Sequence, residues 1–155
     1  MDAHPLLHIV LYEPEIPQNT GNAGRTCVAL GARLWLVRPL GFRLDAPQLR
    51  RAGLDYWEHL DWQAVDGWSG LLTQFPAHRF WYFTKCGQRP HWEAEYQRGD
   101  VLVFGSETRG LPTSMLDSQP ERCLRIPMPG PVRSLNLAAA VAVGAYEAFR
   151  QIQRE

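Results

Sequence analysis

Polar side chains stand directly in front of the most apolar stretch of the chain. Arg133, Ser134 and Asn136 end a loop that holds three prolines and a glycine, and from Leu137 to Ala145 every residue is Leu, Ala, Val or Gly. A guanidinium, a hydroxyl and an amide can hydrogen-bond a ligand, and serine or asparagine can equally cap a helix. This junction is therefore the first place in the sequence to look for chemistry.

The apolar run predicts a helix over 138–151 that has almost no polar face. A helix that is apolar all round is buried on more than one side, and nine such residues are too few to cross a bilayer. We therefore expect one face of this helix to pack on its own sheet and another on a second copy of the chain.

Short apolar runs alternate with helical segments along the rest of the sequence. This alternation predicts one α/β domain over residues 1–155, with a mainly parallel sheet flanked by helices. We expect a helix over 21–30 that ends at Gly31, and a second helix that Asp61 caps and that runs to residue 75. The predicted strands span 6–12, 33–37, 79–84, 101–104 and 123–126.

Four of these strands end in loops rich in polar and turn residues: EPEIPQN, TKCGQRP, GSETRGLP and PMPGPVRSLN. Ligands of parallel α/β sheets sit outside the carboxyl ends of the strands, so we expect the four loops to form one site. The sequence has neither G-x-G-x-x-G nor a P-loop motif, which argues against a Rossmann-like metabolite binder.

At these loops the sequence resembles the SPOUT superfamily of RNA methyltransferases, and within it the small tRNA 2′-O-methyltransferases of the TrmL (YibK) type. Gly24 and Ser106 depart from that family's pattern, but neither change removes a functional group. The matching segments are 12–22 with 25–27, 50–56, 104–112, 126–136 and the Tyr-Glu-Ala at 146–148.

The resemblance implies an S-adenosylmethionine (SAM) site inside a deep trefoil knot near the C-terminal end, and no metal ion. It also implies a homodimer built on the terminal helix, in agreement with the apolar run. Three loops, around 83–85, 105–110 and 126–135, are expected to hold the cofactor. The expected cofactor-binding residues are Phe83, Gly105, Gly110, Ile126, Ser134 and Leu135.

The resemblance also assigns catalytic roles to Arg25, Asn19, Glu107 and Asn136. Arg25 would contact the ribose 2′-hydroxyl and either help to remove its proton or orient it, since a guanidinium is ordinarily no base. The plainer interpretations are a surface arginine for Arg25, helix caps for the asparagines, and a solvated carboxylate for Glu107. Glu107 would orient Arg25 or the knot loops, and Arg109 could be its ion-pair partner.

The implied reaction is SAM-dependent 2′-O-methylation of the wobble nucleotide of tRNA, cytidine or modified uridine at position 34, in certain leucine tRNAs. Arg133 is expected to contact RNA phosphate or the partner subunit, and Tyr146 to approach the substrate or simply pack at the dimer interface. The alternatives are another tRNA or ribosomal RNA site, or a knotted RNA-binding protein without activity.

The overall charge gives no support to a strongly nucleic-acid-binding protein, because Lys+Arg and Asp+Glu both number 16. A local patch of arginines at positions 25, 50, 51, 109 and 133 would reconcile this balance with binding of the anticodon stem-loop. The three cysteines have no metal spacing and read as reduced thiols. No leader or membrane span is recognisable, so we expect a cytoplasmic protein.

Overall fold

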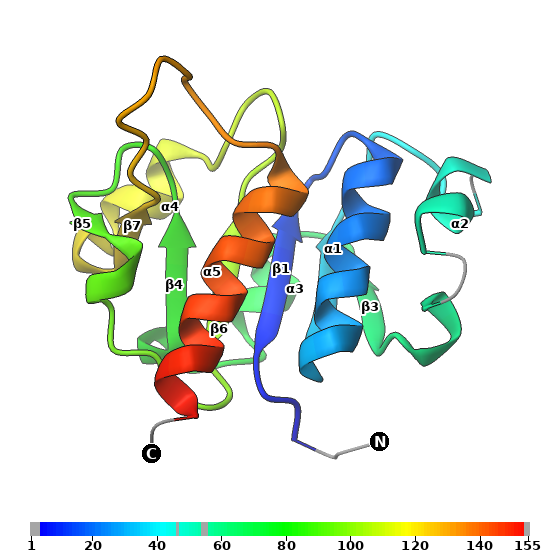
Figure 1. The fold of residues 1–155 in the computed structure, drawn as a ribbon, viewed down its shortest axis with the longest axis horizontal. Helices are drawn as coiled ribbons and strands as arrows, with labels where there is room; N and C mark the ends of the chain where they lie inside the picture. The colour runs from blue at the N-terminus through cyan, green and yellow to red at the C-terminus, as the bar shows by residue number, and fades with distance from the viewer. Residues whose placement is uncertain (1–3, 46, 54–55, 154–155) are drawn as a thin grey trace.

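The computed structural model describes residues 4–45, 47–53 and 56–153, and within them seven strands form one sheet in the order β3-β2-β1-β6-β4-β7-β5. Every neighbouring pair of strands is parallel (Figure 1). The predicted α/β class with a mainly parallel sheet is therefore confirmed. The strands are β1 His8–Tyr12, β2 Arg33–Val37, β3 Trp62–Val65, β4 Phe80–Phe83, β5 Arg89–Pro90, β6 Val101–Phe104 and β7 Cys123–Arg125.

Helices cover both faces of the sheet. The α-helices are α1 Pro17–Leu30, α2 Pro47–Gly53, α3 Trp68–Leu72, α4 Thr113–Asp117 and α5 Leu137–Ile152. Short 3-10 turns lie at Trp57–His59, Ala77–Arg79, His91–Glu93 and Pro120–Arg122. Helices α1 and α5 lie over the same face of the sheet, in front of it in Figure 1.

Alternate residues of each strand pack into two separate hydrophobic cores, because successive side chains of a strand point to opposite faces of the sheet. In β1, Ile9 packs in the core that contains Cys27 of α1 and Val141 of α5. The next residue, Val10, packs on the other face in the core that contains Met115 of α4. Burial on both faces explains why the strands read as continuous apolar runs.

The predicted helix capped by Asp61 is wrong. The Asp61 carboxylate instead accepts a hydrogen bond from Arg33 Nε at 2.8 Å. The residues after it form β3, which pairs with β2, and α3 begins only at Trp68. Tertiary pairing along the sheet edge outweighs the local capping signal here.

Helix α1 begins at Pro17, four residues before the predicted start at Gly21. Proline suits the first helical position, because the N–H that proline lacks would have no intrahelical hydrogen-bond partner at that position. The predicted end is confirmed: Gly31 has a φ of 69°, and its N–H bonds the last carbonyls of the helix. The loop after β1 is therefore short, and Gln18 and Asn19 of the predicted loop lie on the first turn of α1 instead.

Helix α5 leaves one apolar strip uncovered. Val141, Ala145 and Ala148 are fully buried against the sheet and α1. On the other side, Val143 is 38% exposed and Tyr146 is 48% exposed. The expected second copy of the chain on this strip stays a prediction.

The loop after β4 passes β7 at backbone contact. A Cβ atom added to Gly87 would lie 2.5 Å from the carbonyl carbon of Leu124, so only glycine fits this crossing. The resemblance places the threaded loops in this region. The trefoil knot itself stays a prediction.

His8, the first residue of β1, is a buried histidine that stays uncharged at neutral pH. Its Nδ1 accepts a hydrogen bond from Trp35 Nε1 at 3.0 Å, and its ring lies 4.6 Å from the ring of Phe75. Burial is the main reason that the pKa of His8 falls from 6.5 to about 4, and the positive charge of Arg33 adds to this effect.

We expect the free energy of unfolding to decrease as the pH falls from 6.5 to about 4. In that interval the unfolded chain protonates His8 while the folded chain does not, so acid favours unfolding. The loss reaches roughly 3 kcal/mol at the acid end. Urea unfolding across this pH range measures it.

The variant His8→Gln keeps an acceptor for Trp35 but cannot gain a proton, so its stability should depend less steeply on pH. The exposed His78→Gln serves as the matched control and should follow the wild type. Equal pH slopes for the wild type and His8→Gln would contradict the expectation.

Candidate active site

The parallel strands bring the predicted loops to one edge of the sheet. Their carboxyl ends point the same way, and the loops after β1, β6 and β7 lie together above them in Figure 1. Hydrogen bonds between side chains of these loops join three segments that lie far apart in the sequence.

Glu107, in the loop after β6, holds the start of α1. Its Oε1 accepts a hydrogen bond from the N–H of Glu15 at 2.8 Å, and its Oε2 accepts from the N–H of Ile16 at 2.8 Å and from Asn19 Nδ2 at 3.2 Å. A carboxylate at a helix N-terminus also interacts favourably with the helix dipole. Glu107 therefore orders the loops, whereas none of its hydrogen bonds goes to Arg25.

Glu15, in the loop after β1, makes the reciprocal contact with the loop after β6. Its Oε1 accepts hydrogen bonds from the N–H of Thr108 at 3.0 Å and from the Thr108 hydroxyl at 2.6 Å. These bonds lower the pKa of Glu15 below its usual value. The predicted pairing of Arg109 with Glu107 is wrong, because Arg109 forms its ion pair with Glu13 at 3.5 Å. The two loops thus hold each other through two carboxylates.

Asn136 connects this pair of loops to α5. Its Oδ1 caps α5 by accepting from the N–H groups of Ala138 and Ala139, at 2.9 and 3.3 Å. Its Nδ2 donates to Asn19 Oδ1 at 2.9 Å. One side chain therefore both starts α5 and fixes Asn19 on α1.

Asn19 is not the helix cap that the plainer interpretation made it. The N-cap of α1 is Ile16, and Asn19 lies inside the first turn with only 7% of its surface exposed. Its amide donates to Glu107 and its carbonyl oxygen accepts from Asn136. We call Glu107, Asn19 and Asn136 the loop network.

Arg25 lies on the exposed side of α1 and contacts Tyr56 rather than the loop network. Its Nη2 donates to the Tyr56 hydroxyl at 2.7 Å, and its guanidinium carbon lies 4.4 Å from the centre of the Tyr56 ring. Stacking and the hydrogen bond together limit the positions that the guanidinium can take. Tyr56 was not among the predicted site residues, although it closes the matching segment 50–56.

A cavity of about 450 Å³ lies where β7 runs into the loop before α5. Its lining consists of Lys85, Arg125, Ile126, Pro127, Met128, Pro129 and Val132. Apolar walls of this kind suit the adenine of SAM, and the volume lies within the usual range of about 300–1,000 Å³ for small-molecule sites. The residues present therefore fit the expected cofactor.

The other predicted cofactor residues do not line this cavity with their side chains. Phe83 is buried in the core and stacks on Phe104 at 4.5 Å, so any contact with a ligand would come from its backbone. The loop after β6 closes on itself: Ser106 and Gly110 form a backbone bridge, and a Cβ atom added to Gly105 would lie 2.3 Å from the carbonyl carbon of Gly110. Ser134 and Leu135 are exposed on the loop before α5.

The predicted substrate residues, Arg133 and Tyr146, are both exposed. Of the arginines expected in a patch, Arg25, Arg51 and Arg109 are exposed as well, while the side chain of Arg50 lies outside the described part of the chain. The predicted clustering stays a prediction.

Within the described ranges, no three His, Cys, Asp or Glu side chains gather in a way that would hold a metal ion. Among the helices of the same residues, none is both long and apolar enough to cross a membrane. The cysteines are unpaired, with Cys27 and Cys123 buried and Cys86 exposed.

Comparisons with known proteins agree along nearly the whole chain. The model of the SpoU rRNA Methylase family matches residues 6–146. The tRNA (cytidine(34)-2'-O)-methyltransferase of Escherichia coli K12 is 48% identical over 148 residues, which cover 95% of this chain and 94% of that protein. The protein of that name from Saccharophagus degradans is 48% identical over 151 residues, covering 95% and 96%.

A solved structure described as giving structural insights into the 2-OH methylation of C/U34 on tRNA has a similar fold. Its TM-score is 0.92 at 53% sequence identity, and the match covers 97% of this chain and 99% of that chain.

Proposed function

The chain belongs to the SpoU rRNA Methylase family, and from that premise we propose that it transfers a methyl group from SAM to the 2′-hydroxyl of nucleotide 34, the wobble nucleotide, of tRNA. The observation that carries the proposal is the 48% identity, over nearly the full length of both chains, to the tRNA (cytidine(34)-2'-O)-methyltransferase of Escherichia coli. The loop network and the cavity after β7 both involve loops at the carboxyl-end edge of the sheet, which supports a site for this reaction there.

The cavity after β7 is the site for the methyl donor. Ile126, Met128 and Val132 would enclose the adenine, and Ser134 and Leu135 would approach from the same loop. Phe83, Gly105 and Gly110 would contribute backbone groups. Bound SAM supplies a methyl group on a positively charged sulfur, which needs no metal ion for its transfer.

Arg25 is the residue that we assign to the ribose. Its guanidinium would hold the 2′-hydroxyl in line with the methyl group and would help it to lose its proton. Tyr56 limits the guanidinium to a few positions, which favours such a role. We assign Asn19, Glu107 and Asn136 to positioning, because their hydrogen bonds join the loops to one another.

We propose the anticodon stem-loop of certain leucine tRNAs as the substrate, with cytidine or a modified uridine at position 34. Arg133 and Tyr146 are exposed and would contact the RNA or the partner subunit. We propose a cytoplasmic location, because tRNA is the substrate of the proposed reaction. We also propose that residues 1–155 form a single domain.

We also propose that two copies of the chain associate through α5 and that the loops near its start form the trefoil knot. The exposed apolar strip with Val143 and Tyr146 supports the association. Sedimentation equilibrium should give a mass twice the 17.7 kDa of one chain. A mass of one chain at micromolar concentration would exclude this dimer.

The test of the reaction is transfer of labelled methyl from SAM to total tRNA that lacks the modification, followed by nucleoside analysis. We expect 2′-O-methylated cytidine or uridine at position 34. Methylation at another position would place the activity elsewhere on the RNA. Binding of tRNA without any binding of SAM would indicate an RNA-binding protein instead of an enzyme.

A further inference from the structure

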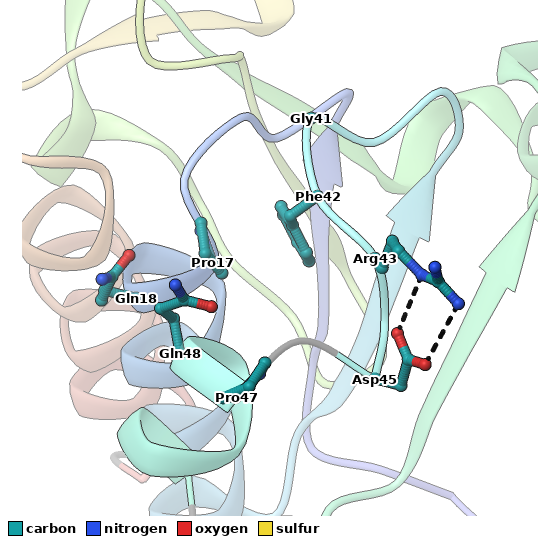
Figure 2. A pocket seen from close by; sticks show the side chains of 8 residues that line it. All are labelled: Pro17, Gln18, Gly41, Phe42, Arg43, Asp45, Pro47 and Gln48. Carbon is teal, nitrogen blue, oxygen red and sulfur yellow. Dashed lines mark hydrogen bonds and ion pairs between the residues drawn. The ribbon is translucent and has the colours of Figure 1, made fainter.

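A second hollow, of about 610 Å³, lies beside the start of α1 and away from the cavity after β7. Figure 2 shows the ring of Phe42 pointing into it from the loop after β2, with the side chains of Gln18 on α1 and Gln48 on α2 reaching it. Pro17 and Pro47 form part of its walls. None of these residues takes part in the loop network or lines the cofactor cavity.

The lining selects for a planar ligand without charge. Phe42 offers an aromatic face, and each glutamine offers both a hydrogen-bond donor and an acceptor. The two charged side chains at the hollow, Arg43 and Asp45, neutralise each other through two hydrogen bonds of 3.2 and 3.3 Å. The charges on the lining therefore sum to zero, and a nucleobase can stack on Phe42 and hydrogen-bond Gln18 and Gln48, whereas a phosphate or a carboxylate would have to compete with Asp45 for Arg43.

The hollow is joined to the loop that starts α1. The N–H of Gly41 donates to the carbonyl oxygen of Pro14 at 2.9 Å, and a Cβ atom added to Gly41 would lie 2.7 Å from the Cα of Glu15. Because Glu107 fixes the same loop, the wall of the hollow and the loop network hold their positions together.

The hollow and Arg25 lie along the same exposed side of α1. Gln18, Asn22 and Arg25 are all exposed, and Gln18 precedes Arg25 by seven residues, which is close to two helical turns. Two turns separate the two side chains by about 10 Å along the helix axis. An RNA strand with its ribose at Arg25 therefore has the hollow within reach of a neighbouring nucleotide.

We propose that this hollow receives an unstacked nucleobase from the anticodon loop, next to the nucleotide that is methylated. The base stacks on Phe42, and its edge hydrogen-bonds Gln18 and Gln48. Sequence-specific RNA recognition commonly targets bases splayed from single-stranded loops, which stack on aromatic side chains in this way. The inference rests on the proposed function, because it takes the RNA from that reaction.

The first test compares variants in steady-state methylation of an anticodon stem-loop. Phe42→Leu keeps apolar bulk but removes the aromatic face, so we expect the KM for RNA to rise roughly tenfold. Phe42→Tyr should stay near the wild type, and the KM for SAM should stay unchanged in both. Gln18→Leu and Gln48→Leu should also raise the KM for RNA, while the exposed Gln74→Leu serves as the control.

The second test removes the base instead of the side chain. A set of stem-loops is prepared, each with a single abasic nucleotide at one of the positions that flank position 34. The methylation of each stem-loop by the wild type and by Phe42→Leu is then measured. At one of these positions we expect the missing base to raise the KM of the wild type for RNA roughly tenfold. The same missing base should raise the KM of Phe42→Leu for RNA hardly at all. That position identifies the base that occupies the hollow.

The outcomes separate this inference from the function on which it rests. Absence of methyl transfer by the wild type would overturn the proposed function and the nucleobase site with it. Wild-type methylation with an unchanged KM for RNA in Phe42→Leu would overturn the nucleobase site alone. Additive losses at every abasic position would do the same, because they would show that Phe42 and the missing base do not interact.

Discussion

Replacing Arg25 by lysine should lower kcat/KM for methyl transfer by about 100-fold or more, the usual effect of removing a donor that stabilises a transition state. Lysine keeps the positive charge, but it has neither the planar fork nor the stacking surface of a guanidinium. Arg25 uses both features, because it stacks on the Tyr56 ring and donates to the Tyr56 hydroxyl. A point charge on a flexible stem would not hold the ribose in one position.

The measurement is methylation of the anticodon stem-loop under single-turnover conditions with saturating SAM. Arg98→Lys, on an exposed loop, is the matched control and should retain full activity. Tyr56→Phe removes the hydrogen bond but keeps the ring, so its loss should be smaller, roughly tenfold. Full activity of Arg25→Lys would refute a role that depends on the guanidinium.

The variant Glu107→Gln should unfold more easily and lose most of its activity. In the native chain both carboxylate oxygens accept hydrogen bonds, from Glu15 and from Ile16 with Asn19. An amide has only one oxygen, so one set of donors would face an NH₂ group without an acceptor. We expect the free energy of unfolding to fall by about 2 kcal/mol.

Urea unfolding at pH 7 measures the loss of stability, and titration with SAM reports on the cavity. Glu95→Gln changes an exposed glutamate in the same way and should leave both quantities unchanged. Because the loops after β1, β6 and β7 share the loop network, methyl transfer should fall by more than the stability change alone explains. A Glu107→Gln variant with wild-type stability would show that the carboxylate is dispensable for loop order.

The edge of the sheet that carries the site was predictable from the sequence, and so were five of the seven strands in the described residues, whereas β3 and β5 were not predicted. The runs at 33–37 and 101–104 form β2 and β6 with the predicted bounds, and all their residues except Arg33 at the start of β2 are buried and apolar. Once the strands are parallel, their following loops must meet at one edge. That geometry brings together the segments that carry Asn19, Glu107 and Asn136, although it does not fix the hydrogen bonds between them.

The partners of individual polar side chains were not predictable. Asp61 looked like a cap because aspartate is a preferred N-cap residue, yet its carboxylate accepts a hydrogen bond from Arg33 on a neighbouring strand. Arg109 stands two residues from Glu107, but their loop turns it toward Glu13. The pairing of Arg25 with Tyr56 joins residues 31 positions apart and depends on the packing of the region after α2 against α1.

The resemblance to a known family indicated a function that the amino-acid composition did not. The balanced charge argued against an RNA enzyme, whereas the segments 12–22, 104–112 and 126–136 indicated one, and the match to the family over residues 6–146 confirms that indication.

The loop network spans 88 positions between Asn19 and Glu107 and 117 positions between Asn19 and Asn136. During synthesis, α1 therefore emerges long before either of its partners exists. A nascent chain that has not yet reached residue 136 has no donor from Asn136 for the carbonyl oxygen of Asn19. The loop network can therefore form only after residue 136 has been synthesised, so the ordering of these loops is a late step in the folding of a nascent chain.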